Sequence, residues 1–231
     1  MIKGFTLVEM LVVLVLMFLI TTVVVSQVVG SSRCSQKIIN NQQRMEAIFH
    51  TVDTIRSDLT KCGMRLQEAS TRFGFPMFEY SAQSLKVLYG VGEEILEEEC
   101  LEEDTTILIN RNEFFTKRKG ILIYDTERGY YEFNEISGWE GDRLILVNPL
   151  QYDYSKGSSA VVLKQVEYKI YPDQKALKRK VNRGYFQPII EEVTDFNVKF
   201  FPEAVSVLYK IEVNEKEQIR GYIFLTNMVE K

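Results

Sequence analysis

The chain has 231 residues, of which 45% are hydrophobic and 26% are charged, as is usual for a folded protein. Its 28 basic and 32 acidic side chains give a net charge of −4, which argues against a surface that coats nucleic acid in general. This balance leaves room for a local basic patch.

The first thirty residues form the most distinctive stretch of the chain. Lys3 and Gly4 precede a long apolar run that contains one acid, Glu9, and no charge at all between Met10 and Val25. The run is too long for a secretory signal peptide and lacks a small-residue cleavage site after it. As a helix, residues 5–29 would be about 37 Å long, enough to cross a membrane. We therefore predict a membrane-spanning helix over residues 5–30.

Glu9 is the exception within this run. A carboxylate at the centre of a membrane helix costs on the order of 3 kcal/mol or more. Glu9 can lie near the end of the span, where the headgroups and the helix dipole accommodate a negative charge. Alternatively, it is retained in order to meet a positively charged partner. The residues alone leave both interpretations open.

The segment Lys3-Gly4-Phe5-Thr6-Leu7-Val8-Glu9 resembles the processing motif of type IV pilins and type II secretion pseudopilins. The resemblance implies that residues 1–4 are a leader, that prepilin peptidase cuts between Gly4 and Phe5, and that Phe5 is then N-methylated. It also implies that Glu9 pairs with the terminal amine of a neighbouring subunit during assembly.

The same resemblance implies a location and a set of partners. The protein would span the inner membrane once, with its N-terminus cytoplasmic and its body outside, before it enters a pilus or pseudopilus. Its partners would be prepilin peptidase, the lipid bilayer, the inner-membrane assembly platform, and other minor pilins and the major pilin through the N-terminal helix.

An amphipathic pattern follows over residues 31–72. Apolar residues recur in steps of three, four and seven, which places them on one face of a helix: Ile38, Met45, Phe49, Val52, Ile55, Leu59, Cys62 and Leu66. The polar section at residues 40–44 predicts an exposed neck. We therefore expect one helix of about 60 residues that continues from the span into the body.

Gly74-Phe75-Pro76 ends the helical region, and residues 73–231 predict a β-rich domain. We expect nine or ten strands, mostly antiparallel, because the connections are too short for crossovers. The fold class is therefore α+β. The expected strands are residues 84–89, 105–110, 120–125, 130–136, 142–147, 160–171, 176–181, 196–200, 207–213 and 219–225, with a hairpin turn at Thr126–Gly129.

No set of residues predicts catalysis, a metal site or a cofactor, so we do not expect an enzyme. His50 is the only histidine, which leaves zinc or Ser-His chemistry without partners. The pair Gly90 and Gly92 predicts a turn rather than a phosphate loop. Residues 93–104 hold eight acids, but their spacing matches no calcium loop, and a solvated segment is the preferred interpretation.

A basic cluster lies near two aromatic residues in the expected hairpin after residue 171. It consists of Lys175, Lys178, Arg179, Lys180 and Arg183, with Tyr185 and Phe186 beside them. Basic and aromatic side chains together are typical of single-strand nucleic-acid binding. A solvated hairpin is the preferred interpretation, because the chain as a whole is acidic.

The three cysteines are Cys34, Cys62 and Cys100. If the body is extracytoplasmic, a disulfide is allowed, and Cys34 is poorly placed to reach the body. We expect a Cys62–Cys100 disulfide worth about 4 kcal/mol. The alternative is three free thiols.

Looser similarities point to one subgroup, the W-type minor pilins and the J-type pseudopilins. They lie at Asp58-Leu59 with Cys62-Gly63-Met64, at residues 120–125, at residues 166–179, and at residues 187–196. Where those proteins often carry alanine, this chain has Cys62. The resemblance implies a subunit that primes filament assembly near the tip. The alternatives are a type II secretion pseudopilin and a tip subunit that binds DNA or a surface.

Overall fold

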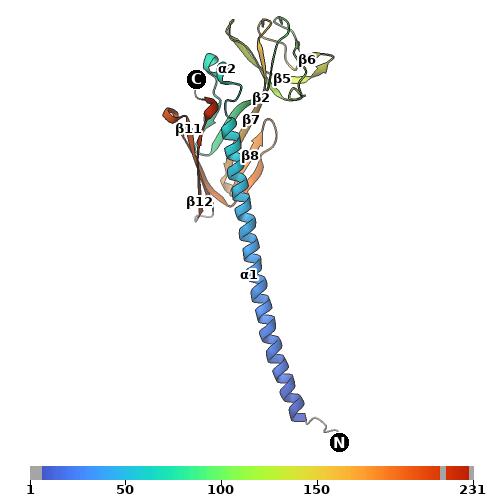
Figure 1. The fold of residues 1–231 in the computed structure, drawn as a ribbon, viewed down its shortest axis with the longest axis vertical. Helices are drawn as coiled ribbons and strands as arrows, with labels where there is room; N and C mark the ends of the chain where they lie inside the picture. The colour runs from blue at the N-terminus through green and yellow to red at the C-terminus, as the bar shows by residue number, and fades with distance from the viewer. Residues whose placement is uncertain (1–6, 214–216, 229–231) are drawn as a thin grey trace. The chain divides into compact units, whose positions relative to one another are not determined.

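The computed structural model describes residues 7–213 and 217–228, which form one long helix, one short helix and twelve strands (Figure 1). The C-terminal part of the long helix packs on a mostly antiparallel β body, so the predicted α+β class is confirmed. The chain divides into two compact units, the first reaching Phe49 and the second running from His50 to the C-terminus.

Helix α1 runs from Leu7 to Lys61 and helix α2 from Gln67 to Phe73. The break between them was not predicted. Gly63 has a φ of 75°, and a Cβ there would lie 2.9 Å from both the Asn227 carbonyl oxygen and the Met77 sulfur. Only glycine therefore fits this turn. The predicted stop at Gly74 is confirmed, since Gly74 is left-handed and its N–H donates to the Ser70 carbonyl.

The predicted apolar stripe is buried only in its second half. Within the body, Ile55 and Leu59 of α1 are fully buried, as are Cys62 and Leu66 after the helix ends. Thr51 extends the buried face and donates from its hydroxyl to the Ile189 carbonyl at 3.0 Å. The helix therefore joins the body through a buried face that begins near residue 50.

The larger sheet has nine strands, all paired antiparallel. Its main path runs β1-β2-β7-β4-β5-β6-β3, with β8 beside β7 and β9 beside β8. The strands are β1 (Phe78–Tyr80), β2 (Ser84–Ile95), β3 (Thr106–Leu108), β4 (Gly120–Asp125), β5 (Tyr130–Glu140), β6 (Arg143–Leu146), β7 (Ser159–Tyr171), β8 (Ala176–Val181) and β9 (Gln187–Glu191).

Strand β7 has different neighbours along its length. It pairs with β2 from Ser159 to Lys169, with β4 from Ser159 to Val162, and with β8 from Val166 to Tyr171. The sheet therefore branches at the middle of β7. The short helix η1 (Pro172–Gln174) connects β7 to β8, and left-handed Lys175 ends it.

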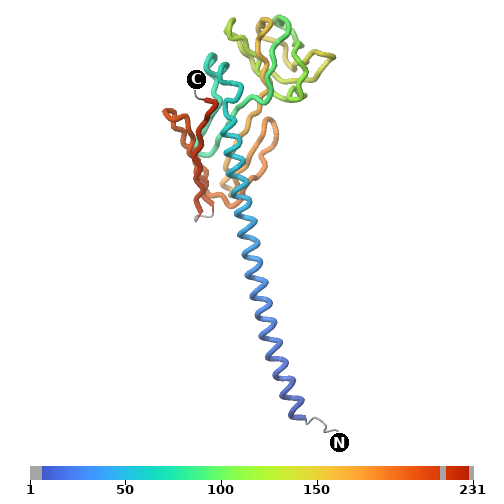
Figure 2. The backbone as a smooth tube through the Cα atoms, in the orientation of Figure 1, coloured from blue at the N-terminus to red at the C-terminus, as the bar shows by residue number. Residues whose placement is uncertain are grey.

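Residues 96–158 form a distinct part of the body, which we call the insert lobe. They connect the end of β2 at Ile95 to the start of β7 at Ser159, and these two residues are direct cross-strand partners. Figure 2 shows this green-to-yellow segment gathered together at one end of the body. The lobe packs around an apolar cluster that it completes with Ala160 and Val162 of β7. Its members within the lobe include Leu96, Cys100, Ile107, Phe115, Ile136, Leu144, Leu150 and Tyr154.

The smaller sheet has the order β10-β11-β12 and closes the chain. Its strands are β10 (Val193–Phe201), β11 (Ser206–Val213) and β12 (Glu217–Phe224), with η2 (Pro202–Ala204) and η3 (Thr226–Met228) between and after them. The ten predicted strands are all present, eight of them with shifted ends, whereas β1 and β9 were not predicted. Both additional strands are short and lie beside strands that were predicted.

Candidate functional surfaces

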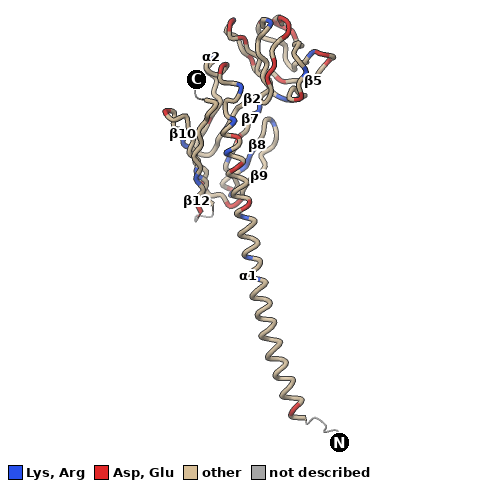
Figure 3. Tube along the Cα trace, viewed as in Figure 1, with Lys and Arg blue, Asp and Glu red and all other residues tan. Residues whose placement is uncertain are grey.

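The N-terminal part of α1 is apolar on every side. Large hydrophobic residues from Leu7 to Val29 are each at least 43% exposed, and mean hydropathy reaches 2.8 over an 18-residue window. Figure 3 shows how few charges this stretch carries. The Thr21 and Thr22 hydroxyls donate to the Met17 and Phe18 carbonyls at 2.7 and 2.8 Å, so both polar groups are satisfied within the helix. A helix of this length and composition is compatible with a single-pass membrane anchor.

The residues of the processing motif fall at the edge of the described chain. Glu9 lies in the first turn of α1. Gly4 and Phe5 lie outside the described residues, so the expected cleavage and methylation site stays a prediction. A carboxylate in the first turn of a helix interacts favourably with the helix dipole.

Asp58 is the centre of a buried polar cluster that joins α1 to the sheet. It is 4% exposed and accepts hydrogen bonds from the Tyr168 hydroxyl at 2.5 Å and from Arg179 Nε at 2.9 Å. The Tyr89 hydroxyl lies 3.4 Å from its other oxygen. Tyr89, Tyr168 and Arg179 come from β2, β7 and β8, so one carboxylate ties the helix to three strands.

The cluster also shifts the pKa values of Tyr89, Tyr168 and Arg179. Burial, followed by the negative charge of Asp58, raises the pKa of both Tyr89 and Tyr168 well above the usual tyrosine value. Burial alone would lower the pKa of Arg179, but the hydrogen bond and charge of Asp58 outweigh that effect and raise it. The cluster therefore holds one negative and one positive charge next to two neutral phenols.

The structure places the members of the predicted basic cluster in different surroundings. Arg179 faces α1 and pairs with Asp58. Lys178 and Lys180 lie on the opposite face of β8, as strand alternation requires, and Lys175 is exposed at the end of η1. Arg183 pairs with Glu135, which belongs to the insert lobe. The five residues therefore do not present one continuous basic surface.

The basic residues on the outer face of β8 already have partners. Lys178 lies 4.7 Å from the centre of the Tyr171 ring, and Lys180 lies 4.7 Å from that of Phe186. Lys180 also pairs with Glu167 at 2.7 Å. Tyr185, by contrast, is 93% exposed. These contacts weaken the nucleic-acid interpretation, because a phosphate would have to replace existing interactions.

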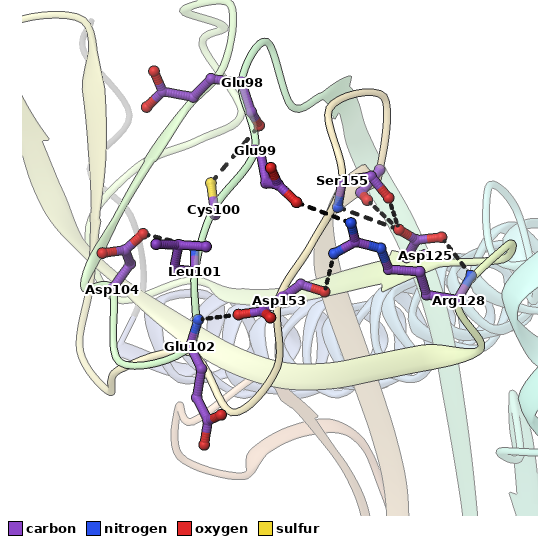
Figure 4. A network of polar contacts seen from close by, with 11 residues as sticks. Glu98, Glu99, Cys100, Leu101, Glu102, Asp104, Asp125, Arg128, Asp153 and Ser155 are labelled. Atoms are coloured by element: carbon purple, nitrogen blue, oxygen red, sulfur yellow. Dashed lines mark hydrogen bonds and ion pairs between the residues drawn. The ribbon is translucent and has the colours of Figure 1, made fainter.

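The acidic run at residues 93–104 is held by contacts within the body (Figure 4). Glu98 pairs with Arg143 at 2.5 Å, and Glu99 pairs with Arg128 at 2.9 Å. Asp104 accepts the Leu101 N–H at 2.8 Å and forms a local turn. Within the described residues, no group of three or more His, Cys, Asp or Glu side chains could hold a metal ion.

Asp125 organises the loops next to this run. Its carboxylate accepts the N–H groups of Glu127 and Arg128, both at 2.9 Å, the N–H and hydroxyl of Ser155, and the Ser158 hydroxyl at 3.0 Å. Burial raises the pKa of this carboxyl, but the hydrogen bonds outweigh burial and lower it to about 2. Asp125 is therefore a structural carboxylate that joins the β4–β5 turn to the loop before β7.

The predicted Cys62–Cys100 disulfide is absent, and all three cysteines are free thiols. Cys62 lies at the end of α1, where its thiol donates to the Met77 carbonyl at 3.3 Å. Cys100 belongs to the separate apolar cluster of the insert lobe. Burial raises the pKa to about 12 for Cys62 and to about 11 for Cys100. The prediction was wrong because Cys62 follows α1 beside Met77, whereas Cys100 packs in the apolar cluster of the insert lobe.

The glycine pair Gly90 and Gly92 is not a turn, as was predicted, but a bulge inside β2. A Cβ at Gly90 would lie 2.6 Å from Val161, and one at Gly92 would lie 2.6 Å from Phe114. Both glycines therefore permit close packing. His50 is exposed on α1, as expected for a helix surface residue.

Sequence reasoning missed two groups that the fold assembles. The Asp58 cluster joins residues up to 121 positions apart, and only Asp58 and Arg179 had been noted, each for another reason. Tyr130 and Tyr152 stack with ring centres 4.7 Å apart, although no local pattern links them. No family model matches this chain, and no curated protein matches it.

Proposed function

We propose that this protein is a minor pilin that prepilin peptidase processes and that helps to initiate assembly of a type IV pilus near its tip. The observation that carries the proposal is the segment Lys3–Glu9 followed at once by an apolar helix. Such a helix can wait in a bilayer and later pack among identical apolar helices in a filament core.

Glu9 provides the chemical basis for assembly. An acid close to a membrane surface is costly to bury alone, and a neighbour's terminal ammonium would neutralise it. Cleavage after Gly4 would create such an ammonium at Phe5, five positions into the chain. Glu9 would then pair with the N-terminal ammonium of the neighbouring subunit that lies beside it in the filament.

The body supports a structural role. The buried face of α1 from Thr51 onward and the Asp58 cluster attach the helix firmly to the sheet. The surfaces of the body are then free to contact other minor pilins. The inner-membrane assembly platform would act on the N-terminal helix, with the body on the outer side of the membrane.

Processing is tested by expressing the full chain with a prepilin peptidase and measuring the mature N-terminus by mass spectrometry. The expected product begins with N-methylated Phe5, and Gly4→Val should abolish it. Gly30→Ala is the matched control, since a Cβ there meets nothing within 4 Å. An intact Met1 on protein recovered from filaments would refute the processing step.

Assembly is tested in a deletion strain by counting surface pili and by co-purifying the other pilin-like proteins. Deletion should reduce pilus number, and Glu9→Gln should fail to restore it although it is still processed. Glu46→Gln is the control, because Glu46 is an exposed acid on the same helix. Normal pilus numbers without the protein would contradict the priming role.

The alternative is a pseudopilin of a type II secretion system, which would carry the same motif and helix. Normal pili combined with loss of protein secretion in the deletion strain would favour it. A tip subunit that binds DNA is less well supported, because Arg179 and Lys180 are already paired in the body.

A further inference from the structure

The insert lobe contains an open cavity of about 410 Å³, lined by Glu102, Arg128, Tyr130, Tyr152 and Asp153. Its volume lies within the range of about 300–1,000 Å³ that is typical of small-molecule sites. The residues come from three separate parts of the lobe, which are the acidic run, the β4–β5 turn and the loop before β7. Neither the pilin motif nor the proposed assembly role uses any of them.

Two tyrosines form the aromatic wall of this cavity. The rings of Tyr130 and Tyr152 are parallel, with centres 4.7 Å apart and planes 3° apart. They remain 42% and 38% exposed although they stack on each other. Because each ring already fixes the other, a ligand that covers them would lose little affinity to side-chain ordering.

Arg128 provides hydrogen-bond donors that are held in place (Figure 4). Its two terminal nitrogens donate to the Glu99 carboxylate at 2.9 Å and to the Asp153 carbonyl at 3.3 Å. Its backbone N–H is fixed by Asp125. A guanidinium has five N–H donors, so some remain for a ligand in the cavity.

Glu102 and Asp153 provide acceptors. One oxygen of Asp153 accepts the Glu102 N–H at 2.7 Å, which holds these two loops together. Among the residues that the structure describes, neither carboxylate forms an ion pair. The cavity thus combines a stacked pair of aromatic rings, a guanidinium positioned by Glu99 and two carboxylates that remain in water.

We propose that this cavity binds a saccharide. Glu102 and Asp153 disfavour an anionic ligand, because Glu99 already pairs with Arg128. A cationic ligand is the competing class, and the tetralysine probe represents it. An aliphatic ligand would remove these charged groups from water without replacing their hydrogen bonds. A saccharide has hydroxyls that donate to carboxylates and accept from a guanidinium, and its apolar C–H face covers an aromatic ring.

The inference is independent of the proposed function, since a subunit of a pilus or of a secretion machine would carry such a site equally well. If no saccharide binds to the cavity, the tests of cleavage and assembly keep their meaning. The site would allow the subunit to contact a polysaccharide through the insert lobe while α1 serves assembly.

The test uses the full chain in a detergent without a sugar headgroup, such as a dimethylamine oxide. The probes are methyl β-D-glucoside, methyl β-D-galactoside and N,N′-diacetylchitobiose, each titrated to about 10 mM and followed by saturation-transfer NMR. At least one probe should bind, and Tyr130→Ala and Tyr152→Ala should each weaken it about tenfold or more.

Tyr185→Ala is the matched control, because it removes a more exposed tyrosine outside the cavity and should leave binding unchanged. Glu102→Gln tests the acceptors without removing a ring, and the fluorescence of Trp139 within the lobe reports whether each variant is folded. The proposal is overturned if no probe binds, if the tyrosine and Glu102 variants bind like the wild type, or if only a tetralysine peptide binds.

Discussion

Removing the Asp58 carboxylate is the sharpest test of how the helix is attached to the body. Asp58→Ala loses the hydrogen bonds from Tyr168 at 2.5 Å and from Arg179 at 2.9 Å, each worth about 1.5–3 kcal/mol because one partner is charged. The Arg179 side chain is 22% exposed, so water can partly compensate its lost partner. We therefore expect a loss of about 3 kcal/mol, at the lower end of the effect of breaking a buried pair.

The assay is thermal unfolding of the full chain in detergent, followed by circular dichroism. A loss of 3 kcal/mol should lower the midpoint by about 6–12 °C in a body of this size. A double-mutant cycle with Arg179→Ala isolates the interaction between the two side chains, and its coupling energy should be about 2 kcal/mol.

The pair Glu79 and Lys86 serves as the control for this cycle. These residues join β1 to β2 at 3.1 Å, but their side chains are 49% and 35% exposed. An exposed ion pair should give a coupling energy of about 0.5 kcal/mol or less. If the Asp58–Arg179 coupling is no larger than that of this control pair, the buried cluster does not anchor the helix.

Three further predictions concern acid, a glycine and the thiols. The pKa of Asp125 falls from 3.8 to about 2 on folding, so the stability that its carboxylate provides is complete above about pH 4 and is lost as the pH falls toward 2. After solvent screening, this contribution to the free energy of unfolding is about 1 kcal/mol. Asp125→Asn should therefore make the free energy of unfolding less dependent on pH between about 4 and 2, and an unchanged dependence would contradict this prediction. Gly221→Ala places a Cβ 2.2 Å from the buried Tyr209 ring and should lower the free energy of unfolding, measured in urea, by about 2 kcal/mol. Gly120→Ala, whose Cβ has its nearest neighbour 3.8 Å away, should lower it less. Maleimide should label Cys34 in the native protein but Cys62 and Cys100 only after unfolding, because burial raises the pKa of these two thiols to about 12 and 11. An intact mass lower by two hydrogens would indicate a disulfide and contradict this prediction.

Local periodicity was sufficient for much of the fold. The strand at residues 120–125 and the one at residues 176–181 were predicted with the bounds that the structure has. The alternation at Phe196 and Val198 correctly identified the buried face of β10. These features depend on neighbours in sequence, which a pattern can report.

Features that depend on distant contacts were not predictable. Alternation along residues 176–181 places Arg179 on the face opposite Lys178 and Lys180, but it does not indicate that the partner of Arg179 is Asp58 on a helix far along the chain. The glycines at 90 and 92 resembled a turn because a bulge is defined by the partner strand. The different surroundings of Cys62 and Cys100 likewise depend on contacts between residues far apart in the sequence.

The insert lobe begins and ends at a single pair of facing residues, Ile95 and Ser159. A segment whose ends meet in this way is an insertion in a β2–β7 hairpin. A short turn would be long enough to connect the two strands without it. The cavity beside Arg128 lies wholly within this segment, whereas its apolar cluster also includes Ala160 and Val162 of β7. Exchange of this one continuous segment would therefore change the cavity without altering helix α1.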